Sequence, residues 1–393
     1  MKKINTAKTR ILIFETLKPA YQDLFASVNE DYFEIAAIID NESAVTHSAD
    51  IPVVSFTEIV DFSFWDLLVV NDEVFHEDIL EILSMLHIPK ERYVFLSKSI
   101  QPEEFGFYRA FFSAGSSNGK LLDFFLVKRG QNYLTVATEG GDYITHASDY
   151  AISANMFLRK QTYSQREIDL FILLAKQYYG TTQNESAFFF DIGANIGTTC
   201  IYVKKCLLPN ISIAAFEPIY KNYKLLLANF ILNDITDYVA VNKAVSDASA
   251  SYKMRFEAGN PGGSSIVSGE EAMEASDLQS VDSLSVDEFL MQNHIEPANV
   301  RYVWIDTEGF EANVLKGAKL LLEQEKTAFY MEYAPYLTDV KQLTIVADIC
   351  SRYFRQFICT DDFLSGDTQP RPIEDLYELY KRCPDGTNVF LIK

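Results

Sequence analysis

The sequence lacks the features that define several common classes of protein. Its five cysteines are odd in number and form no C-x-x-C pair, which argues against a disulfide framework and a cysteine-based metal site. No run approaches the roughly 18 apolar residues that a membrane span needs. The apolar stretch after the basic N-terminus meets Glu15 and Lys18 too early for a signal peptide. We therefore predict a soluble, cytoplasmic protein without a membrane span.

Positive charge is also scarce. The chain of 393 residues has 34 Lys and Arg against 55 Asp and Glu, so its net charge is −21. The resulting field repels phosphate backbones, and we predict no nucleic-acid partner. A hydrophobic content of 48% with 23% charged residues is typical of globular proteins. Because the chain is longer than a domain with a single hydrophobic core usually is, we predict more than one domain.

Short apolar runs alternate with helical stretches in the first hundred residues, a pattern typical of a parallel sheet covered on both faces. The runs are 11–14, 33–39, 53–55, 65–70 and 93–96. Residues 1–100 are therefore predicted to form a smaller, Rossmann-like α/β domain. Its first turn, residues 14–19, has no glycine, which removes the close backbone approach that a pyrophosphate needs. We interpret the domain as a degenerate scaffold for packing or homo-oligomerisation, with a sugar-nucleotide site as the alternative.

Residues 101–180 are predicted to form a connector. Two short strands are expected at 133–137 and 143–145, and Ser164 with Glu167 has the spacing of a capping box that opens a helix reaching about Tyr179. This segment is expected either to cover the catalytic site as a lid or to pack between the domains.

The most informative stretch is a buried strand followed by a turn of small residues. Asp191 ends the strand, and Gly193 and Gly197 enclose Asn195, unlike the three glycines of a dinucleotide turn. A carboxylate here attracts the ammonium and sulfonium groups of S-adenosylmethionine (SAM), whereas it repels phosphates. Backbone N–H groups at the helix start can receive the methionine carboxylate. The pattern predicts SAM as the cofactor.

A second acid, Glu217, ends the apolar run 211–216, about 20 residues after the turn, where it can accept both ribose hydroxyls. A nicotinamide site places an acid at the same position. A nicotinamide-dependent oxidoreductase therefore remains an alternative, as does a non-catalytic module that binds a sugar nucleotide or supports assembly.

Three stretches together resemble the FkbM-type family of SAM-dependent methyltransferases: 191–197, 216–218, and 304–311 followed by 314–318. The resemblance spans about 187–332, and 388–392 resembles the closing strand of the family. It implies a seven-stranded, Rossmann-like class I sheet over residues 181–393, and it adds Asn242 to the cofactor-binding residues. It also implies methyl transfer to a hydroxyl of a sugar, a glycan precursor or a secondary metabolite. The sequence departs from the family at Trp304, commonly a lysine, and at Arg301, usually an acid.

Carboxylates also follow two apolar runs of the predicted sheet. Asp306 and Glu308 come after 302–305, and Glu332 comes after 328–331, so the crevice at the carboxyl ends of these strands receives all three. A carboxylate can remove the proton of an acceptor hydroxyl. Asp306 is our first candidate for this base and Glu332 the second, while Glu308 is the third or bonds to its own turn.

The remaining predictions concern the metal and the acceptor. The five histidines form no ligand pair, and the acids match no recognised calcium loop, so we predict no metal site. The loop 258–265, rich in glycine and serine, is the candidate segment for holding a small-molecule or glycan acceptor.

Overall fold

The structure is a computed structural model, and it describes residues 9–15, 28, 33–39, 52–54, 67–71, 83–86, 88, 93–95, 131–149, 151–180, 187–255, 265–267, 278–338 and 340–393. The chain divides into two compact units, residues 1–129 and residues 130–393. Residues 258–264 of the loop predicted to hold the acceptor lie outside the described residues, and so do residues 16–19 of the glycine-free first turn.

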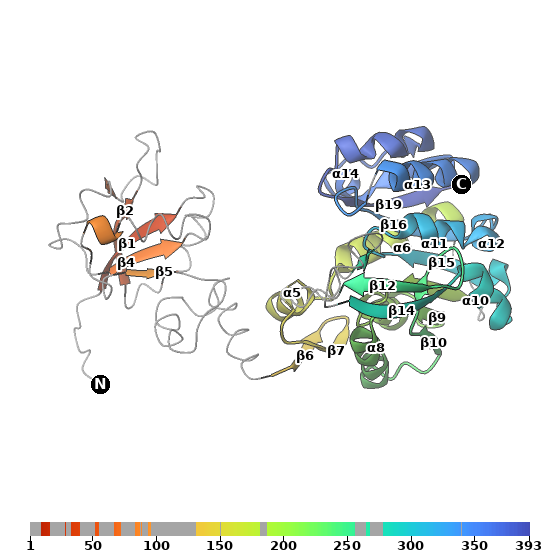
Figure 1. Cartoon of the computed structure of the whole chain (residues 1–393), viewed down its shortest axis with the longest axis horizontal. Coiled ribbons are helices and arrows are strands. Elements are labelled where there is room, and N and C mark those ends of the chain that lie inside the picture. The colour runs from red at the N-terminus through yellow and green to blue at the C-terminus, as the bar shows by residue number, and fades with distance from the viewer. Residues whose placement is uncertain are drawn as a thin grey trace. The chain divides into compact units, whose positions relative to one another are not determined.

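The first unit is built on a parallel sheet of five strands in the order β3-β2-β1-β4-β5 (Figure 1). The strands are β1 (Thr9–Glu15), β2 (Phe33–Ile39), β3 (Val53–Val54), β4 (Leu67–Asn71) and β5 (Tyr93–Phe95). Leu12, Ile39 and Leu68 are completely buried within it. The apolar runs of the sequence thus correspond to buried parallel strands.

The second unit is built on a sheet of eight strands in the order β10-β9-β8-β15-β16-β19-β17-β18. Their bounds are β8 (Phe188–Ile192), β9 (Ser212–Phe216), β10 (Tyr238–Val241), β15 (Val300–Ile305), β16 (Ala328–Tyr333), β17 (Gln356–Cys359), β18 (Arg371–Pro372) and β19 (Thr387–Ile392). The expected number was seven. The additional strand, β18, is a two-residue edge strand that pairs with β17. Two residues are too few to show the pattern of apolar residues from which a strand is predicted.

This sheet is parallel over its first five strands, and the last three strands alternate in direction. Strands β10, β9, β8, β15 and β16 run parallel, whereas β19 is antiparallel to both of its neighbours, β16 and β17. Along the chain, β8 leads outward to β9 and β10, and the chain then returns to place β15 on the other side of β8. The carboxyl ends of β8 and β15 therefore flank a topological switch point, where open α/β sheets hold their ligands.

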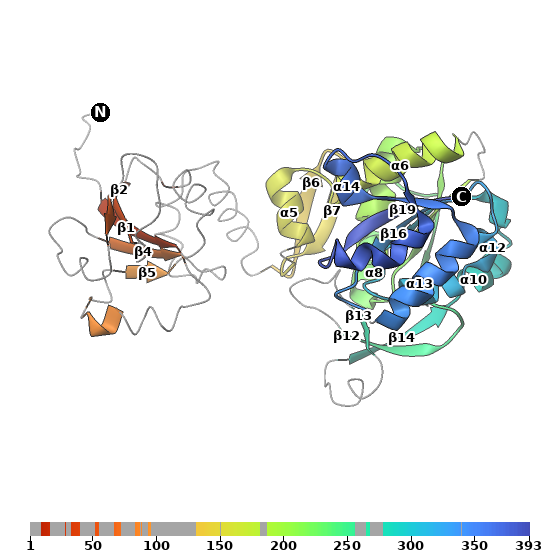
Figure 2. The same ribbon diagram turned by 90° about the horizontal axis from the view of Figure 1, so that it is seen from above.

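Helices cover both faces of this sheet. The helices and helical turns are α5 (Ile152–Arg159), α6 (Gln165–Tyr179), α7 (Thr198–Tyr202) continued by a π-helical turn (Val203–Leu207), α8 (Tyr220–Leu232), α10 (Val286–Gln292), α11 (Glu311–Lys316), α12 (Lys319–Leu322), α13 (Val340–Tyr353) and α14 (Thr360–Leu364), with 3-10 turns at Pro297–Asn299 and Ile373–Lys381. Side chains of α10 to α13 pack into the same cluster as Phe190, Val303 and Met331. On the opposite face lies α6, as Figure 2 shows.

The contact between α6 and the sheet is aromatic. The ring of Phe171 lies with its centroid 5.3 to 6.2 Å from five rings of the sheet. These rings belong to Phe189, Tyr302, Trp304, Tyr330 and Phe390. Alternate residues of one strand thus serve opposite faces, and the central strands are buried on both sides, as the continuous apolar runs predict.

The described part of the predicted connector belongs to the second unit. It comprises the hairpin of β6 (Tyr133–Thr138) and β7 (Gly141–His146), followed by α5 and α6. The predicted helix is present, but the prediction of a capping box at its start is wrong. Ser164 has a left-handed φ of 53° and makes no side-chain cap, while Ser285 and Glu288 form a capping box at the start of α10. The left-handed backbone turns the Ser164 hydroxyl away from the N–H groups of the first turn.

A smaller sheet of four strands, β11-β14-β12-β13, lies beside the main one. Its strands are β11 (Ala244–Val245), β12 (Ser251–Arg255), β13 (Ser265–Val267) and β14 (Leu278–Leu284). Ala244, Met254 and Val281 pack with Ile219 into a separate apolar cluster. Among the helices in the described ranges, none combines the length and the apolar character needed to cross a bilayer.

Candidate active site

A cavity open to solvent lies at the carboxyl ends of β8, β9 and β15, with about 520 Å³ of empty space that includes part of the solvent at its mouth. Its acidic lining comes from Glu217, Asp306 and Glu308, and Lys243 is a cation among the lining residues. The apolar part of the lining comes from the loop after β9, from the small sheet and from the loop after β15. These apolar residues include Pro218, Ile219, Val245, Met254 and Phe310.

The cavity brings together a subset of the predicted site residues. Gly193, Asn195 and Glu217 line it from the predicted cofactor set, and Asp306 and Glu308 line it from the predicted catalytic set. The other predicted residues are not part of the lining. These are Asp191, Gly197, Asn242 and Glu332.

The two glycines of the turn after β8 are required by packing. A Cβ atom on Gly193, which has a φ of 91°, would lie 1.7 Å from the carbonyl oxygen of Asp306. A Cβ atom on Gly197, at a φ of 89°, would lie 2.7 Å from Cδ1 of Leu226. Only glycine fits such a left-handed, crowded position. The glycines therefore let the turn approach β15 and α8, and Asn195 lies between them at the cavity wall.

Asp191 lies beneath the turn. Its side chain is buried, and Oδ2 accepts a hydrogen bond of 3.1 Å from the backbone N–H of Cys200 in α7. Its Oδ1 has no hydrogen-bond partner among the described residues. Burial raises the pKa of Asp191 to about 7, which the bond from Cys200 partly offsets. Asp191 thus fixes the first turn of α7 from behind the cavity.

Glu217 joins the turn to the loop that follows β9. Its Oε2 accepts the backbone N–H of Asn195 at 2.8 Å, and its Oε1 accepts that of Ile219 at 2.7 Å. Burial raises the pKa of Glu217 to about 8, while these two bonds and one from the Asn222 side chain lower it. From behind, the Asn242 amide donates to the carbonyl oxygens of Glu217 and Pro218 at 2.9 and 3.0 Å. Asn242 therefore holds the loop that presents Glu217.

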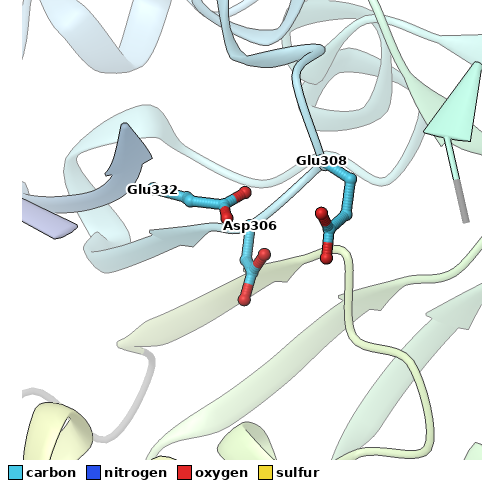
Figure 3. A group of neighbouring side chains, drawn as sticks. All are labelled: Asp306, Glu308 and Glu332. Carbon is cyan, nitrogen blue, oxygen red and sulfur yellow. The ribbon is translucent and has the colours of Figure 1, made fainter. Parts of the chain in front are cut away.

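Asp306, Glu308 and Glu332 form an acidic cluster, whose carboxyl groups converge in Figure 3. One oxygen of each lies within 4.8 Å of the others, a donor set that suits an oxygen-seeking cation. Burial raises the pKa of all three, most for Glu332 and least for Asp306. Repulsion raises it further, from Glu311 at Asp306, and from both Asp306 and Glu311 at Glu308 and Glu332. A hydrogen bond from the Glu332 side chain lowers the pKa of Asp306. At neutral pH the cluster therefore keeps a proton on Glu332 and ionises first at Asp306.

Two residues support this cluster in ways that the sequence did not reveal. Glu311 accepts three hydrogen bonds, from the N–H and Oγ1–H of Thr307 and from the N–H of Gly309, at 2.8 to 3.2 Å. It thereby fixes the loop in which Glu308 has a left-handed φ of 53°. Its position in the first turn of a helix was the available signal. Trp304 stacks on Tyr330 with ring centroids 4.5 Å apart and bonds through its side chain to Asp306.

The sequence also gave no indication of several residues of the cavity wall. Met254 and Phe310 come from different elements, and Tyr252 of β12 packs against Phe310 with ring centroids 5.3 Å apart. Asn222 lines the cavity from the first turn of α8. Lys243 directly follows Asn242, which the family resemblance indicated, but only its position in space places it at the cavity.

The residues of this site fall within a stretch that matches a known protein family. Residues 191–344 match the model of the methyltransferase FkbM domain. The matched stretch is thus similar to an FkbM methyltransferase domain. The match confirms the resemblance drawn from the motifs, and the matched stretch begins at Asp191 and includes the entire acidic cluster. Methyltransferases of this family use SAM, the cofactor expected from the turn. No curated protein matches the sequence.

Solved structures with some similarity are also methyltransferases. A precorrin-6y C5,15-methyltransferase from Geobacter metallireducens is 11% identical, with 58% of this chain and 89% of that chain covered and a TM-score of 0.29. A SAM-dependent O-methyltransferase from Thermotoga maritima is 10% identical, with 69% and 81% covered and a TM-score of 0.32. A tRNA (uracil-54, C5)-methyltransferase from Pyrococcus abyssi is 12% identical, with 67% and 44% covered and a TM-score of 0.33.

Proposed function

We propose that this protein transfers a methyl group from SAM to a hydroxyl group of a sugar, a glycan precursor or a secondary metabolite. The observation that carries the proposal is the acid-lined cavity at the switch point of an FkbM methyltransferase domain. The domain supports methyl transfer, and the converging carboxylates supply a base for a hydroxyl acceptor.

The charge of the cavity fits SAM. Glu217, Asp306 and Glu308 line the cavity with carboxyl groups whose raised pKa values let them ionise when a cation binds, and Lys243 contributes positive charge. An excess of carboxylates disfavours a pyrophosphate, whereas it favours the sulfonium and ammonium groups of SAM. Glu217 alone would be compatible with a nicotinamide dinucleotide as well as with SAM. The additional acids of the cavity argue against the dinucleotide.

Individual residues fit parts of the cofactor. Glu217 is the group that would hold the ribose hydroxyls, and Ile219, Val245 and Met254 offer apolar surface for the adenine ring. Asn195 would contribute polar contacts from the turn. Asp191 and Asn242 act as positioning residues in this account, because both bond to the backbone that carries the lining residues.

When bound, SAM supplies an electrophilic methyl group that an oxygen nucleophile can attack. Asp306 would take the proton of the acceptor hydroxyl, because its pKa is raised least within the cluster. Glu332 keeps its proton and donates to Asp306, which holds the base in its ionised form. The loop fixed by Glu311 positions the carboxylate, and such alignment is a major part of catalysis in a displacement reaction.

The proposal is tested with SAM that carries an isotopically labelled methyl group and a panel of sugars, glycans and hydroxylated metabolites. Matched amine and thiol analogues are included. Labelling of the hydroxyl compounds is expected for the natural chain, lost in Asp306→Asn and kept in Asp282→Asn, a change of an exposed acid in β14. Label on nitrogen or sulfur only would contradict O-methylation.

A further inference from the structure

We propose that His146 is a positioning residue for the cofactor and acts through Asn222 on Glu217. The inference rests on the proposed function, because it assumes that Glu217 holds the ribose. His146 lies on the β6–β7 hairpin, before the FkbM domain begins at residue 191. The hairpin would thus complete the cofactor site of a domain to which it does not belong in sequence.

The first step is the docking of the hairpin on α8, which lies beside β7 in Figure 1. The Asn229 amide accepts the N–H of Ile144 at 2.6 Å and donates to its carbonyl oxygen at 3.1 Å. The Asn233 amide bonds in the same way to the N–H and carbonyl oxygen of Asp142, at 3.1 and 2.6 Å. Two side chains of a helix therefore replace a neighbouring strand.

The spacing explains why this arrangement works. Four residues of a helix rise about 6 Å, and two residues of a strand rise about 6.6 Å, so the pairs remain in register. Asn229 also donates to the carbonyl oxygen of Ile196, inside the turn after β8. The hairpin is consequently held at a fixed register against both α8 and the turn.

His146 continues the same row of the strand by two residues. Its Nε2 lies 2.9 Å from Oδ1 of Asn222, and both side chains are buried. Since the Asn222 oxygen can only accept, the imidazole N–H donates to it. The Asn222 amide nitrogen is thereby directed to donate, and its side chain bonds to the carboxyl group of Glu217. The result is a hydrogen-bonded chain from the hairpin to the cavity.

Loss of the histidine donor would leave the Asn222 amide without a fixed orientation. A flipped amide would present its oxygen to Glu217, and two acceptors would face each other whenever the carboxyl group is ionised. Glu217 would then lose one of the donors that hold it beside Asn195 and Ile219. The net value of one such hydrogen bond corresponds to a change in affinity of roughly tenfold.

The test measures binding of S-adenosylhomocysteine to the full chain by calorimetry. His146→Phe removes the donor and is expected to weaken binding roughly tenfold, whereas His146→Gln, which keeps a donor, is expected to restore affinity to within about twofold. If His146→Phe does not fold, His146→Ala removes the donor without added volume. The control is Asn233→Ala, which loosens the same hairpin without reaching Glu217 and is expected to lower the melting temperature but not the affinity.

Three outcomes would overturn the inference. If His146→Phe binds S-adenosylhomocysteine as tightly as the natural chain does, the chain of hydrogen bonds is irrelevant to binding. Equal losses in His146→Phe, His146→Gln and Asn233→Ala would reduce His146 to general support of the hairpin. A natural chain that binds no S-adenosylhomocysteine would overturn the proposed function itself, an outcome separate from the other two.

Discussion

At the scale of single residues, burial decides the protonation of the carboxyl groups around the cavity. Water solvates a carboxylate far better than a protein interior does, so each buried acid holds its proton to a higher pH. Asp191 and Glu217 show this effect singly, and Asp306, Glu308 and Glu332 show it with added mutual repulsion. The acids are therefore poised to change charge near neutral pH or when a cation arrives.

The order of ionisation within the cluster predicts different results for two nearly isosteric changes. Asp306→Asn removes the group that ionises first, so turnover should fall by about 10² or more while SAM affinity is nearly kept. Glu332→Gln replaces a group that is protonated at neutral pH, so turnover should stay within a few fold. Steady-state kinetics on one acceptor measure both, and a greater loss in Glu332→Gln would reverse the assignment.

The pH dependence of stability follows from the raised pKa of Glu217. Between its ordinary value of 4.5 and about 8, the folded chain holds a proton that the unfolded chain has lost. The free energy of unfolding must therefore fall as pH rises through this window. In Glu217→Gln this contribution is absent, so the mutant should show a smaller fall between pH 5 and about 8. Denaturant titrations across the window test this, and parallel curves for both chains would contradict it.

The acidic cluster also allows a direct test of metal dependence. We expect turnover to be unchanged after treatment with EDTA, because a shared proton already relieves the repulsion between Asp306 and Glu332. Added Mg²⁺ or Ca²⁺ should neither raise turnover nor shift the melting temperature. A loss of activity with EDTA that Mg²⁺ restores would assign the three carboxylates to an ion instead.

At the scale of elements, the turn after β8 joins three strands. The N–H groups of Gly193 and Ala194 both donate to the carbonyl oxygen of Phe216 in β9, and the N–H of Asp306 after β15 donates to Ile192. These hydrogen bonds, together with the lack of a side chain at Gly193 and Gly197, allow the ends of β8, β9 and β15 to lie close together. The cavity exists because these strand ends are held together.

Gly193→Ala should therefore be severe. Gly180→Ala is a matched control, because Gly180 also has a positive φ, 77°, but a Cβ atom there meets nothing within 4 Å. The control should cost about 1 to 2 kcal/mol of backbone strain. The clash with the Asp306 backbone should cost several kcal/mol more. Chemical denaturation measures both, and equal losses would show that the turn tolerates a side chain.

The elements also show what could be predicted from sequence. Continuous apolar runs gave the buried strands, and the acids that follow them gave the lining residues Glu217, Asp306 and Glu308. The sequence could not show that Asp191 points behind the turn, because direction depends on register between strands. It also could not reveal Met254 or the pairing of Asn229 with Ile144, since both depend on contacts between segments distant in sequence.

At the scale of the whole molecule, α6 belongs to the same compact unit as the eight-stranded sheet. We predicted a boundary at 181, whereas the compact unit starts at residue 130. We propose that a fragment of residues 130–393 folds and binds SAM like the full chain. A fragment of 181–393 lacks α6 and its Phe171, so the aromatic face of the sheet would be exposed to water. We expect this fragment to aggregate, because a typical domain is stable by only about 5 to 15 kcal/mol and cannot lose so much buried surface. Circular dichroism and gel filtration distinguish the two, and a well-folded shorter fragment would contradict the account.

The charge of the cavity is the central claim at this scale, and one calorimetric comparison tests it most directly. The full chain is titrated with SAM and with NAD⁺, and the SAM titration is repeated on Glu217→Ala. The account predicts one SAM site per chain, roughly tenfold or greater weakening in the mutant, and no measurable heat with NAD⁺. NAD⁺ binding in place of SAM, or SAM binding that Glu217→Ala leaves unchanged, would contradict it.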